Sequence, residues 1–357
     1  MAATNAMRVG LGRGFSVAAA AAAVSSERGR SLARALTGRA LASNSGPGFT
    51  FAIAGAAGKQ FGTVARCEAA SSAAKPTVVE SLPPSMLAGG AGKQTLRLYQ
   101  YESCPFCRKV RASLDYLKLP YEIVEVNPLS KAETKTIAPD YKKVPVLVVE
   151  GEKEAIQLRD SKTIVKSLLG DKNPGVGASA PVPKATASTG KMWIDIPENL
   201  STEELWVLWT DKVLAQCLVL NVYRTLTESA ETFKYLFTHP AFPWYAQYSA
   251  SIAGTSVMYM IAKRRKKKYE VEDARQAMYE ACNLLAESAA HGKGKFLGGD
   301  KPGTADFNAY GILRAAEGCQ TERDLASSCP SLALWFDAMR DIVGPSCALN
   351  AGSVKRG

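Results

Sequence analysis

Histidine is nearly absent from this chain, whose 357 residues include only His239 and His291. An active site with a histidine base, or a metal site with histidine ligands, needs several such residues at defined spacings, so the sequence argues against both. Close cysteine pairs are also scarce, because only Cys104 and Cys107 of the eight cysteines lie near each other. A disulfide-stapled secreted module is shorter and denser in cysteine. We therefore expect a reducing compartment, one special dithiol and no bound metal.

Acidic residues are scarce at the amino-terminal end, where residues 1–75 hold nine Lys and Arg but only Glu27 and Glu68. Alanine, serine and arginine dominate this stretch, which is typical of an organellar transit peptide. A merely disordered tail is the alternative, but disorder alone does not explain the lack of acids. The apolar stretch Gly48–Gly58 is too short to span a bilayer. We predict a targeting segment for a mitochondrion or a chloroplast.

The net charge of +11 is concentrated in two places. Residues 1–75 carry +7, and the run Lys263–Lys268 consists of six consecutive cations. The rest of the chain is close to neutral, which does not describe a basic groove for a nucleic-acid backbone. We expect no nucleic-acid partner.

The residues after a Pro- and Gly-marked linker (76–93) alternate between strand and helix patterns. Strands are predicted over 95–101, 121–126, 144–149 and 155–158, and helices over 104–117, 130–137 and 161–169. A strand, a helix and a strand within about 30 residues form a βαβ unit with a parallel pair. The order βαβαββα predicts a thioredoxin-like α/β domain over residues 94–170.

A second linker, residues 171–194, is followed by helical patterns alone over residues 195–345. Ser201 and Glu204 form a capping box that starts the first helix. Helices are predicted over 201–227, 241–268, 271–288, 306–316 and 332–342. Asp306 is expected to bond back to the loop at Gly303, since glycine at that cap position has no side-chain acceptor. The fold class predicted is an α/β thioredoxin-like domain followed by an all-α domain of glutathione transferase type.

The motif Cys104-Pro-Phe-Cys107 lies where a strand gives way to a helix. The helix dipole and the free amides of the first turn favour a thiolate at Cys104, which makes it the candidate nucleophile. Cys107 lies one turn further on, within reach of a disulfide or a hydrogen bond. A zinc half-site is the alternative, but the chain has no second Cys-x-x-Cys or histidine pair to complete it. Attachment of a c-type haem needs histidine at position 108, where the chain has Arg108.

Two further elements complete a candidate ligand site. A proline that opens a strand, as in Val144-Pro145, leaves the preceding backbone groups free to pair with a peptide-like ligand. Asp160 and Ser161 precede a helix, so they cap it, and their side chains could also hold the carboxylate and amine of an amino acid. A dithiol, a free main chain and a zwitterion clamp together describe a site for glutathione, a γ-glutamyl tripeptide.

These motifs resemble a known family. Residues 95–170 are similar to the amino-terminal domain shared by glutaredoxins and glutathione transferases. The segments YESCPFCRKVR (101–111), LPY (119–121), VEVNP (124–128), KVP (143–145) and 158–161 resemble the membrane-associated prostaglandin E synthase type 2 family, and the likeness extends over residues 95–345. A plain glutaredoxin would have a Gly-Gly turn at Asp160-Ser161 and no helical domain.

The resemblance implies a glutathione-dependent isomerase that converts the endoperoxide prostaglandin H, or a related lipid peroxide, to prostaglandin E. It implies that glutathione is bound through Val144, Pro145, Asp160 and Ser161, with Tyr101, Cys104, Phe106 and Cys107 at the reactive end. It also implies haem held through the glutathione sulfur. Two alternatives stay open: a glutaredoxin-like thiol–disulfide oxidoreductase, and a glutathione- or haem-binding protein without turnover.

Residues 239–262 contain no Asp, Glu, Lys or Arg and precede the basic run. Their Ser, Thr, Gln and Tyr content is too polar for a membrane span, so we interpret them as a helix of the domain core. The basic run is either a solvated helix end or a contact with anionic lipid headgroups. A peripheral membrane contact and a homodimer stay open as arrangements of this chain.

Overall fold

The computed structural model describes residues 76–83, 94–151, 154–170, 180–291 and 294–350. All elements below belong to one compact unit, residues 70–357. The predicted targeting segment, residues 1–75, lies outside the described residues, as do residues 171–179 of the predicted linker 171–194. The described part of that linker contains a short helical turn, Ala187–Met192, which the sequence analysis did not predict.

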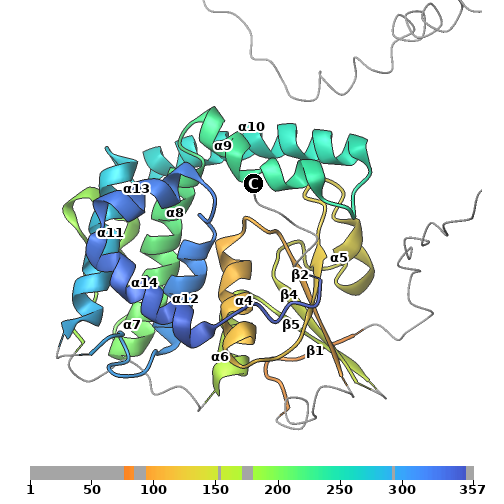
Figure 1. Ribbon diagram of the computed structural model, residues 1–357, viewed down its shortest axis with the longest axis horizontal. Coiled ribbons are helices and arrows are strands. Elements are labelled where there is room, and N and C mark those ends of the chain that lie inside the picture. Colours follow the sequence, from red (N-terminus) through yellow and green to blue (C-terminus); the bar gives the residue numbers. More distant parts are fainter. Residues whose placement is uncertain (1–75, 84–93, 152–153, 171–179, 292–293, 351–357) are drawn as a thin grey trace, which may run out of the picture. The chain divides into compact units, whose positions relative to one another are not determined.

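The amino-terminal part of this unit is a five-stranded mixed sheet with the strand order β1-β5-β4-β2-β3 (Figure 1). Its elements are β1 (Thr77–Val78), β2 (Thr95–Gln100), α4 (Pro105–Tyr116), β3 (Glu122–Glu125), α5 (Ala132–Ile137), β4 (Val146–Glu150), β5 (Ala155–Arg159) and α6 (Ser161–Leu169). Strands β2 and β3 are parallel, and β4 runs antiparallel to both β2 and β5. The predicted βαβαββα order is present, with one added strand.

The added strand β1 lies within the segment that we expected to be a linker. It pairs parallel to β5, and the Gln157 side chain donates a hydrogen bond to the Pro76 carbonyl at 2.7 Å. A strand of two residues has no periodicity, so the sequence pattern could not reveal it.

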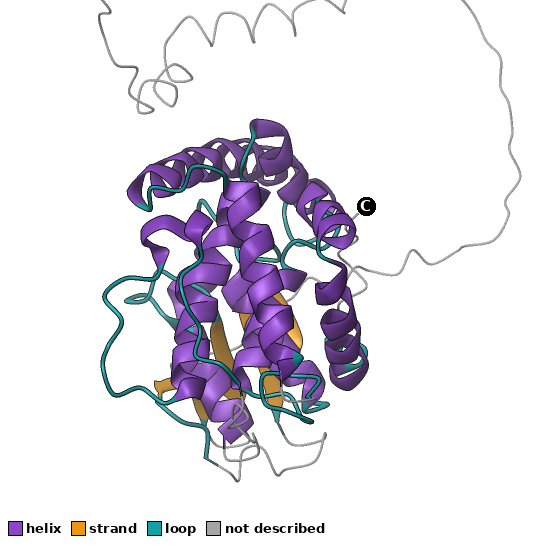
Figure 2. Cartoon of the chain, turned by 90° about the vertical axis from the view of Figure 1, so that its left-hand side faces the viewer, coloured by secondary structure: helices purple, strands orange, loops and turns teal. Residues whose placement is uncertain are grey.

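The carboxyl-terminal part is helical. Its elements are η2 (Ala187–Met192), α7 (Thr202–Trp209), the π-helical turn η3 (Thr210–Leu214), α8 (Ala215–Val222), α9 (Leu226–Thr232), η4 (Lys234–Thr238), α10 (Trp244–Lys268), α11 (Ala274–Ala289), α12 (Thr304–Arg314), α13 (Gln320–Ser328) and α14 (Pro330–Val343). Figure 2 shows these helices in front of the sheet. The predicted single helix 201–227 is wrong in extent, because the helix ends at Val222 after the π-helical turn. Helices α9 and α13 were not predicted. The expectation that residues 239–262 form a helix of the domain core is also wrong, because only Ala250, Ser251 and Ala262 of α10 are buried.

Two predicted caps are present. Ser201 Oγ accepts a hydrogen bond from the Glu204 amide, and the Glu204 carboxylate accepts one from the Ser201 amide at 2.9 Å. The fully buried Asp306 carboxylate accepts hydrogen bonds from the amides of Leu297, Gly298 and Gly303 and from the indole of Trp335. Asp306 therefore joins the loop before α12 to α14.

One segment within the described residues, Thr202–Val222, is long and apolar enough to cross a membrane by length and composition alone. Two thirds of it is buried inside the protein, with Trp206 and Trp209 fully covered. A core helix passes the same test, so this burial explains the apolar composition.

The last described residues return to the sheet. Tyr121 and Ala348 form a parallel bridge beside β3, and the Leu349 amide donates a hydrogen bond to the Tyr121 carbonyl at 2.8 Å. The Asn350 side chain exchanges two hydrogen bonds with the backbone of Ile123. The carboxyl-terminal tail thus covers an edge strand whose backbone groups would otherwise be exposed.

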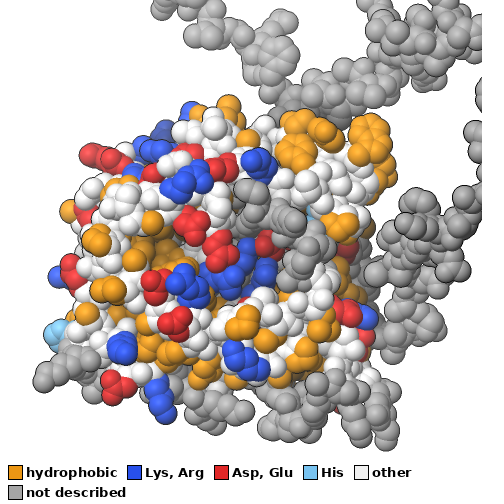
Figure 3. Space-filling model, viewed as in Figure 1, with side chains coloured by type: hydrophobic (Ala, Val, Ile, Leu, Met, Phe, Trp, Pro, Cys, Tyr) orange, Lys and Arg blue, Asp and Glu red, His pale blue; other side chains and the backbone are white. Residues whose placement is uncertain are grey.

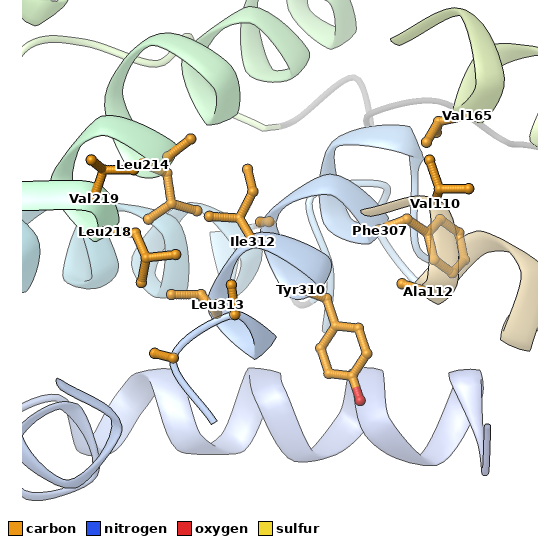
Figure 4. Packing of buried hydrophobic residues seen from close by; sticks show 14 of the residues in the cluster. Val110, Ala112, Val165, Leu214, Leu218, Val219, Phe307, Tyr310, Ile312 and Leu313 are labelled. Atoms are coloured by element: carbon orange, nitrogen blue, oxygen red, sulfur yellow. The ribbon is translucent and has the colours of Figure 1, made fainter. Parts of the chain in front are cut away.

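The two parts pack through α4 and α12. Phe307 of α12 packs on α4 (Figure 4), where its ring centroid is 4.5 Å from that of Tyr116. At Gly311 the two helices touch through their backbones, since a Cβ atom there would lie 2.5 Å from Lys109 Cα. The helical domain therefore holds α4 in place.

We predict that Gly311→Ala destabilises the protein by about 1–3 kcal/mol, because the added methyl group meets backbone atoms that cannot turn aside. Chemical denaturation measures this change, and Ser256→Ala on the exposed side of α10 is the control, with a change within about 0.5 kcal/mol. An unchanged free energy of unfolding in Gly311→Ala would contradict the backbone contact between α4 and α12.

Candidate functional site

The dithiol lies at the amino end of α4. Cys104 is the N-cap residue, and Pro105, which needs no amide partner, is the first helical residue. The amides of Cys107 and Arg108 both donate to the Cys104 carbonyl at 3.1 Å. The Cys104 side chain is half-buried and that of Cys107 is buried. A ligand therefore meets Cys104 first.

The surroundings separate the pKa values of the two thiols. A hydrogen bond from Cys107, helped by the amides of Cys107 and Phe106 and by the Lys109 ammonium, lowers the pKa of Cys104 below its usual value. Burial, together with the Cys104 thiol, raises the pKa of Cys107 well above the usual value. This pattern fits Cys104 as nucleophile and Cys107 as its hydrogen-bond donor.

Tyr101 and Phe106 flank the dithiol in the chain. Burial and the two thiols raise the pKa of Tyr101, so its hydroxyl stays neutral and keeps a proton to donate. Phe106 is half-buried, and the Lys109 ammonium lies 5.6 Å from its ring centroid. Lys109 itself is fully buried and pairs with Asp211 of the helical domain at 2.6 Å.

Strand register brings the predicted ligand-binding elements to one end of the sheet. Val146 lies opposite Tyr99 on β2 and opposite Arg159 on β5. Val144 precedes Val146 by two residues. Because β4 runs antiparallel to β2 and β5, Tyr101 and Ser161, which follow Tyr99 and Arg159 by two residues, lie beyond the same end of the strands. The three predicted elements, which are far apart in sequence, therefore meet at the end of the sheet where α4 begins.

The Val144-Pro145 peptide bond is cis. Val144 is half-buried and Pro145 is buried. No hydrogen bond is recorded between the backbone of Val144 and the described part of the chain. The main chain of Val144 is therefore available to a ligand.

Asp160 caps α6 with φ 70° and accepts a hydrogen bond from the Lys162 amide at 3.1 Å. The Asp160 side chain is exposed, whereas Ser161 is buried. Arg159 contacts the Asp140 carboxylate through both terminal nitrogens, so it does not neutralise Asp160. The carboxylate of Asp160 thus keeps accepting capacity for a ligand amine.

An ion-pair network that the sequence analysis missed lies below the loop before Cys104. The buried Glu102 carboxylate pairs with the guanidinium groups of Arg108 and Arg111. Arg108 also approaches Glu317 of the helical domain at 3.4 Å. One signal could have revealed the network, because residues 108, 111 and 115 are charged at helical spacing and must share one face of α4.

No group of three His, Cys, Asp or Glu side chains in the described ranges is arranged to hold a metal ion.

Comparison with known proteins identifies the family. Two family models match: the glutathione S-transferase N-terminal domain over residues 98–175 and the C-terminal domain over residues 268–338. Prostaglandin E synthase 2 of Danio rerio is 36% identical over 272 residues, which cover 69% of this chain and 70% of that protein. The chain belongs to the prostaglandin E synthase 2 family. Prostaglandin E synthase 2 of Mus musculus is 37% identical over 256 residues, which cover 64% of this chain and 66% of that protein.

Solved structures that align with this chain are more distant in sequence. A glutathione S-transferase from Rhodospirillum rubrum aligns with a TM-score of 0.38 at 19% identity, over 69% of this chain and 88% of that one. Glutaredoxin 2 from Salmonella typhimurium, solved in complex with glutathione, aligns with a TM-score of 0.39 at 14% identity, over 70% of this chain and 94% of that one.

The predicted fold class is confirmed by the two domain matches and by the observed architecture. Membership of the prostaglandin E synthase 2 family, with these domains, supports a glutathione-dependent enzyme of the glutathione S-transferase type.

We predict that Cys107→Ala raises the pH at which Cys104 ionises, because it removes the thiol that donates to the Cys104 thiolate. At neutral pH less thiolate is then present, so alkylation of Cys104 by iodoacetamide slows. The pH profile of the alkylation rate, with the modified residue identified by mass spectrometry, measures this shift. Cys107→Ser is the matched control because it keeps a donor. Identical profiles for the alanine variant and the wild type would contradict the assigned hydrogen bond.

Proposed function

We propose that this member of the prostaglandin E synthase 2 family binds glutathione and isomerises an endoperoxide, prostaglandin H or a related lipid peroxide, to the hydroxyketone. One observation carries the proposal: the Cys104 thiol, the free main chain of Val144 and the Asp160-Ser161 cap share one end of the sheet. That arrangement matches the sulfur, the peptide backbone and the terminal charges of a γ-glutamyl tripeptide. Bound glutathione would supply a second thiol at this site.

The residues at the reactive end support a balanced reaction. The Cys104 thiolate attacks one peroxide oxygen, the O–O bond breaks, and the other oxygen leaves as an alkoxide. The Tyr101 hydroxyl donates a hydrogen bond to this developing charge. Loss of the proton from the carbon that bears the sulfur-bound oxygen forms the ketone, breaks the S–O bond and returns the thiolate. The alkoxide ends as the alcohol, so no oxidant or reductant is consumed.

Thiol–disulfide exchange is the second candidate function. It is favoured by the position of Cys107 in the first turn of α4, which directly follows the N-cap Cys104, because Cys-x-x-Cys spacing lets the second thiol resolve a mixed disulfide on the first. Haem is not part of the proposal. A histidine nitrogen is a common ligand of haem iron, but the buried His239 is already engaged within its own loop. Its Nδ1 accepts a hydrogen bond from the Ala241 amide, and its ring packs on Phe242.

Titration calorimetry with glutathione, followed by an endoperoxide isomerisation assay, tests the proposal. We expect Asp160→Ala to weaken glutathione binding about tenfold, since a charged hydrogen bond contributes about 1.5 kcal/mol or more. Glu154→Ala, at the far end of β5, is the matched control. Cys104→Ser should bind glutathione and lose isomerisation. If Cys104→Ser still isomerises the endoperoxide but no longer reduces disulfides, the isomerase role assigned to this thiol is wrong, and Cys104 serves disulfide exchange instead.

A lipid-derived substrate suggests a membrane contact, and α10 offers a surface for it. One side of this helix exposes Tyr245, Tyr248, Ile252 and Met260, and Trp244 is 72% exposed beside them. Figure 3 shows hydrophobic side chains gathered over the upper right of the molecule, where α10 begins.

The same helix ends in the six cations of the basic run and contains no acidic residue. Aromatic side chains followed by Lys and Arg are typical of segments that lie on anionic lipid. We therefore propose that α10 holds the protein at a membrane surface.

Co-sedimentation with vesicles tests this contact. We expect binding to vesicles that contain phosphatidylserine, weaker binding at high salt, and a loss of about fivefold for Lys267→Ala, or about 1 kcal/mol for one surface cation. Lys234→Ala, on η4, is the control. Binding to neutral vesicles that equals binding to anionic ones would contradict the electrostatic part. A dimer that dissociates on Tyr245→Ser, with no vesicle binding, would assign the surface to a second copy of this chain.

A further inference from the structure

The carboxyl group of Glu125 is buried close to the loop that precedes Cys104, and the proposed function does not use it. Glu125 is the last residue of β3, lies opposite Gln100 in the parallel β2–β3 pair, and is 4% exposed. One carboxylate oxygen, Oε1, accepts hydrogen bonds from the Glu102 amide and the Tyr235 hydroxyl, both at 2.8 Å. The other, Oε2, accepts one from the Gln100 side chain at 3.3 Å.

The Oε1 atom of Glu125 therefore joins β3, the loop before Cys104 and the helical domain. Glu102 lies in the loop, two residues before Cys104, and Tyr235 belongs to η4 of the helical domain. Within the loop, the Cys104 amide donates to the Tyr101 carbonyl at 3.0 Å. The position of the loop therefore depends on a carboxyl that the helical domain holds from its other side.

Glu125 differs from its neighbour Glu102 in the charge of its partners. Glu102 pairs with two guanidinium groups, whereas the recorded donors to Glu125 are an amide, a hydroxyl and a side-chain amide, all neutral. A buried carboxylate without a cation is costly, so its neutral form is favoured. Burial, together with the negative charge of Glu102, raises the pKa of Glu125 to about 8.

The Glu125 carboxylate is joined to the segment that carries the dithiol. It accepts a hydrogen bond from the amide of Glu102, the residue directly after Tyr101, and the Tyr101 carbonyl accepts one from the Cys104 amide. Burial is the main cause of the raised pKa of Cys107, and the Glu125 carboxylate adds to it. Burial, the two thiols and the Glu125 carboxylate likewise raise the pKa of Tyr101. The state of Glu125 therefore acts on Cys107 and on the proposed hydroxyl donor.

Other charged and titratable groups surround this cluster. They are Glu102 and Tyr101 of the loop, Arg108, Arg111 and Cys107 of α4, Glu133 of α5, Tyr235 of η4, and His239, which feels the charge of Glu102. The two arginines are directed to Glu102, so neither makes a recorded ion pair with Glu125. The Oε1 atom of Gln100 is buried without a partner among the described residues. After rotation of its amide, that atom could accept a hydrogen bond from a protonated Glu125.

We propose that Glu125 is a positioning residue for the dithiol: its carboxyl holds the loop before Cys104, and its proton controls the negative charge near Cys107. When Glu125 is protonated, that charge is absent and Cys107 ionises more readily. When the proton has left to solvent, the carboxylate opposes ionisation of Cys107. This inference rests on the proposed function only in taking the dithiol as the reactive end of the site.

Carbon-13 NMR of the glutamate carboxyl groups tests the titration directly. We expect one carboxyl resonance with a midpoint near pH 8, absent in Glu125→Gln. Glu122→Gln, on the same strand but 40% exposed and paired with Arg97, is the matched control and should keep that resonance. Tyr235→Phe removes a donor to the ionised form, so the midpoint should move to higher pH. A midpoint in the ordinary glutamate range would overturn the proposal.

The effect on the thiols is measured by ultraviolet thiolate absorbance in a Cys104→Ser background, with the Cys104→Ser/Cys107→Ser protein as blank. Adding Glu125→Gln should move the ionisation of Cys107 to lower pH, and adding Glu122→Gln should not. An unchanged midpoint would overturn the control of Cys107 by Glu125. If Glu125→Gln shows no cooperative melting transition, the shift caused by Tyr235→Phe decides. Neither measurement uses endoperoxide or glutathione, so failure of the proposed function and failure of this inference are distinguishable.

Discussion

The arrangement of this protein depends on three cations that are buried on α4. They are Arg108, Lys109 and Arg111, paired with Glu102, Asp211 and Glu317. A buried charge that loses its partner is strongly destabilising, so each pair must form in the folded state. The partners come from the loop on one side of α4 and from the helical domain on the other. The amino end of α4, which carries Cys104, is therefore fixed by the pairs that join the two domains.

The same constraint explains why two neighbouring carboxyls behave differently. The arginines of α4 are committed to Glu102, which leaves Glu125 with neutral donors. The Glu102 carboxylate in the loop is thus paired with two guanidinium groups, whereas the Glu125 carboxyl has no cationic partner in the described part of the chain. Burial without a cation raises the pKa of Glu125 to about 8, and carboxyls whose environments differ in this way recur where a protein controls protons.

Periodicity and caps predicted much of the fold. The alternation in residues 95–101, the apolar run that follows Pro145 and the capping box at Ser201 predicted two strands and a helix start that are present. The predicted helix 201–227 failed because its apolar pattern passes through a π-helical turn at 210–214 and stops at Val222. The return of Ala348 to the edge of β3 was missed because a bridge of one residue leaves no pattern.

The sequence by itself determined the dithiol, its position before a helix, the cap at Asp160 and the order of the elements. These are local features, set by residues within one or two turns of each other. Only the tertiary structure decided that Val144, Asp160 and Cys104 share one end of the sheet, and that Tyr235 reaches Glu125. Those contacts join residues far apart in the chain, and a side chain's partners and burial depend on how separate elements pack, which no local pattern contains.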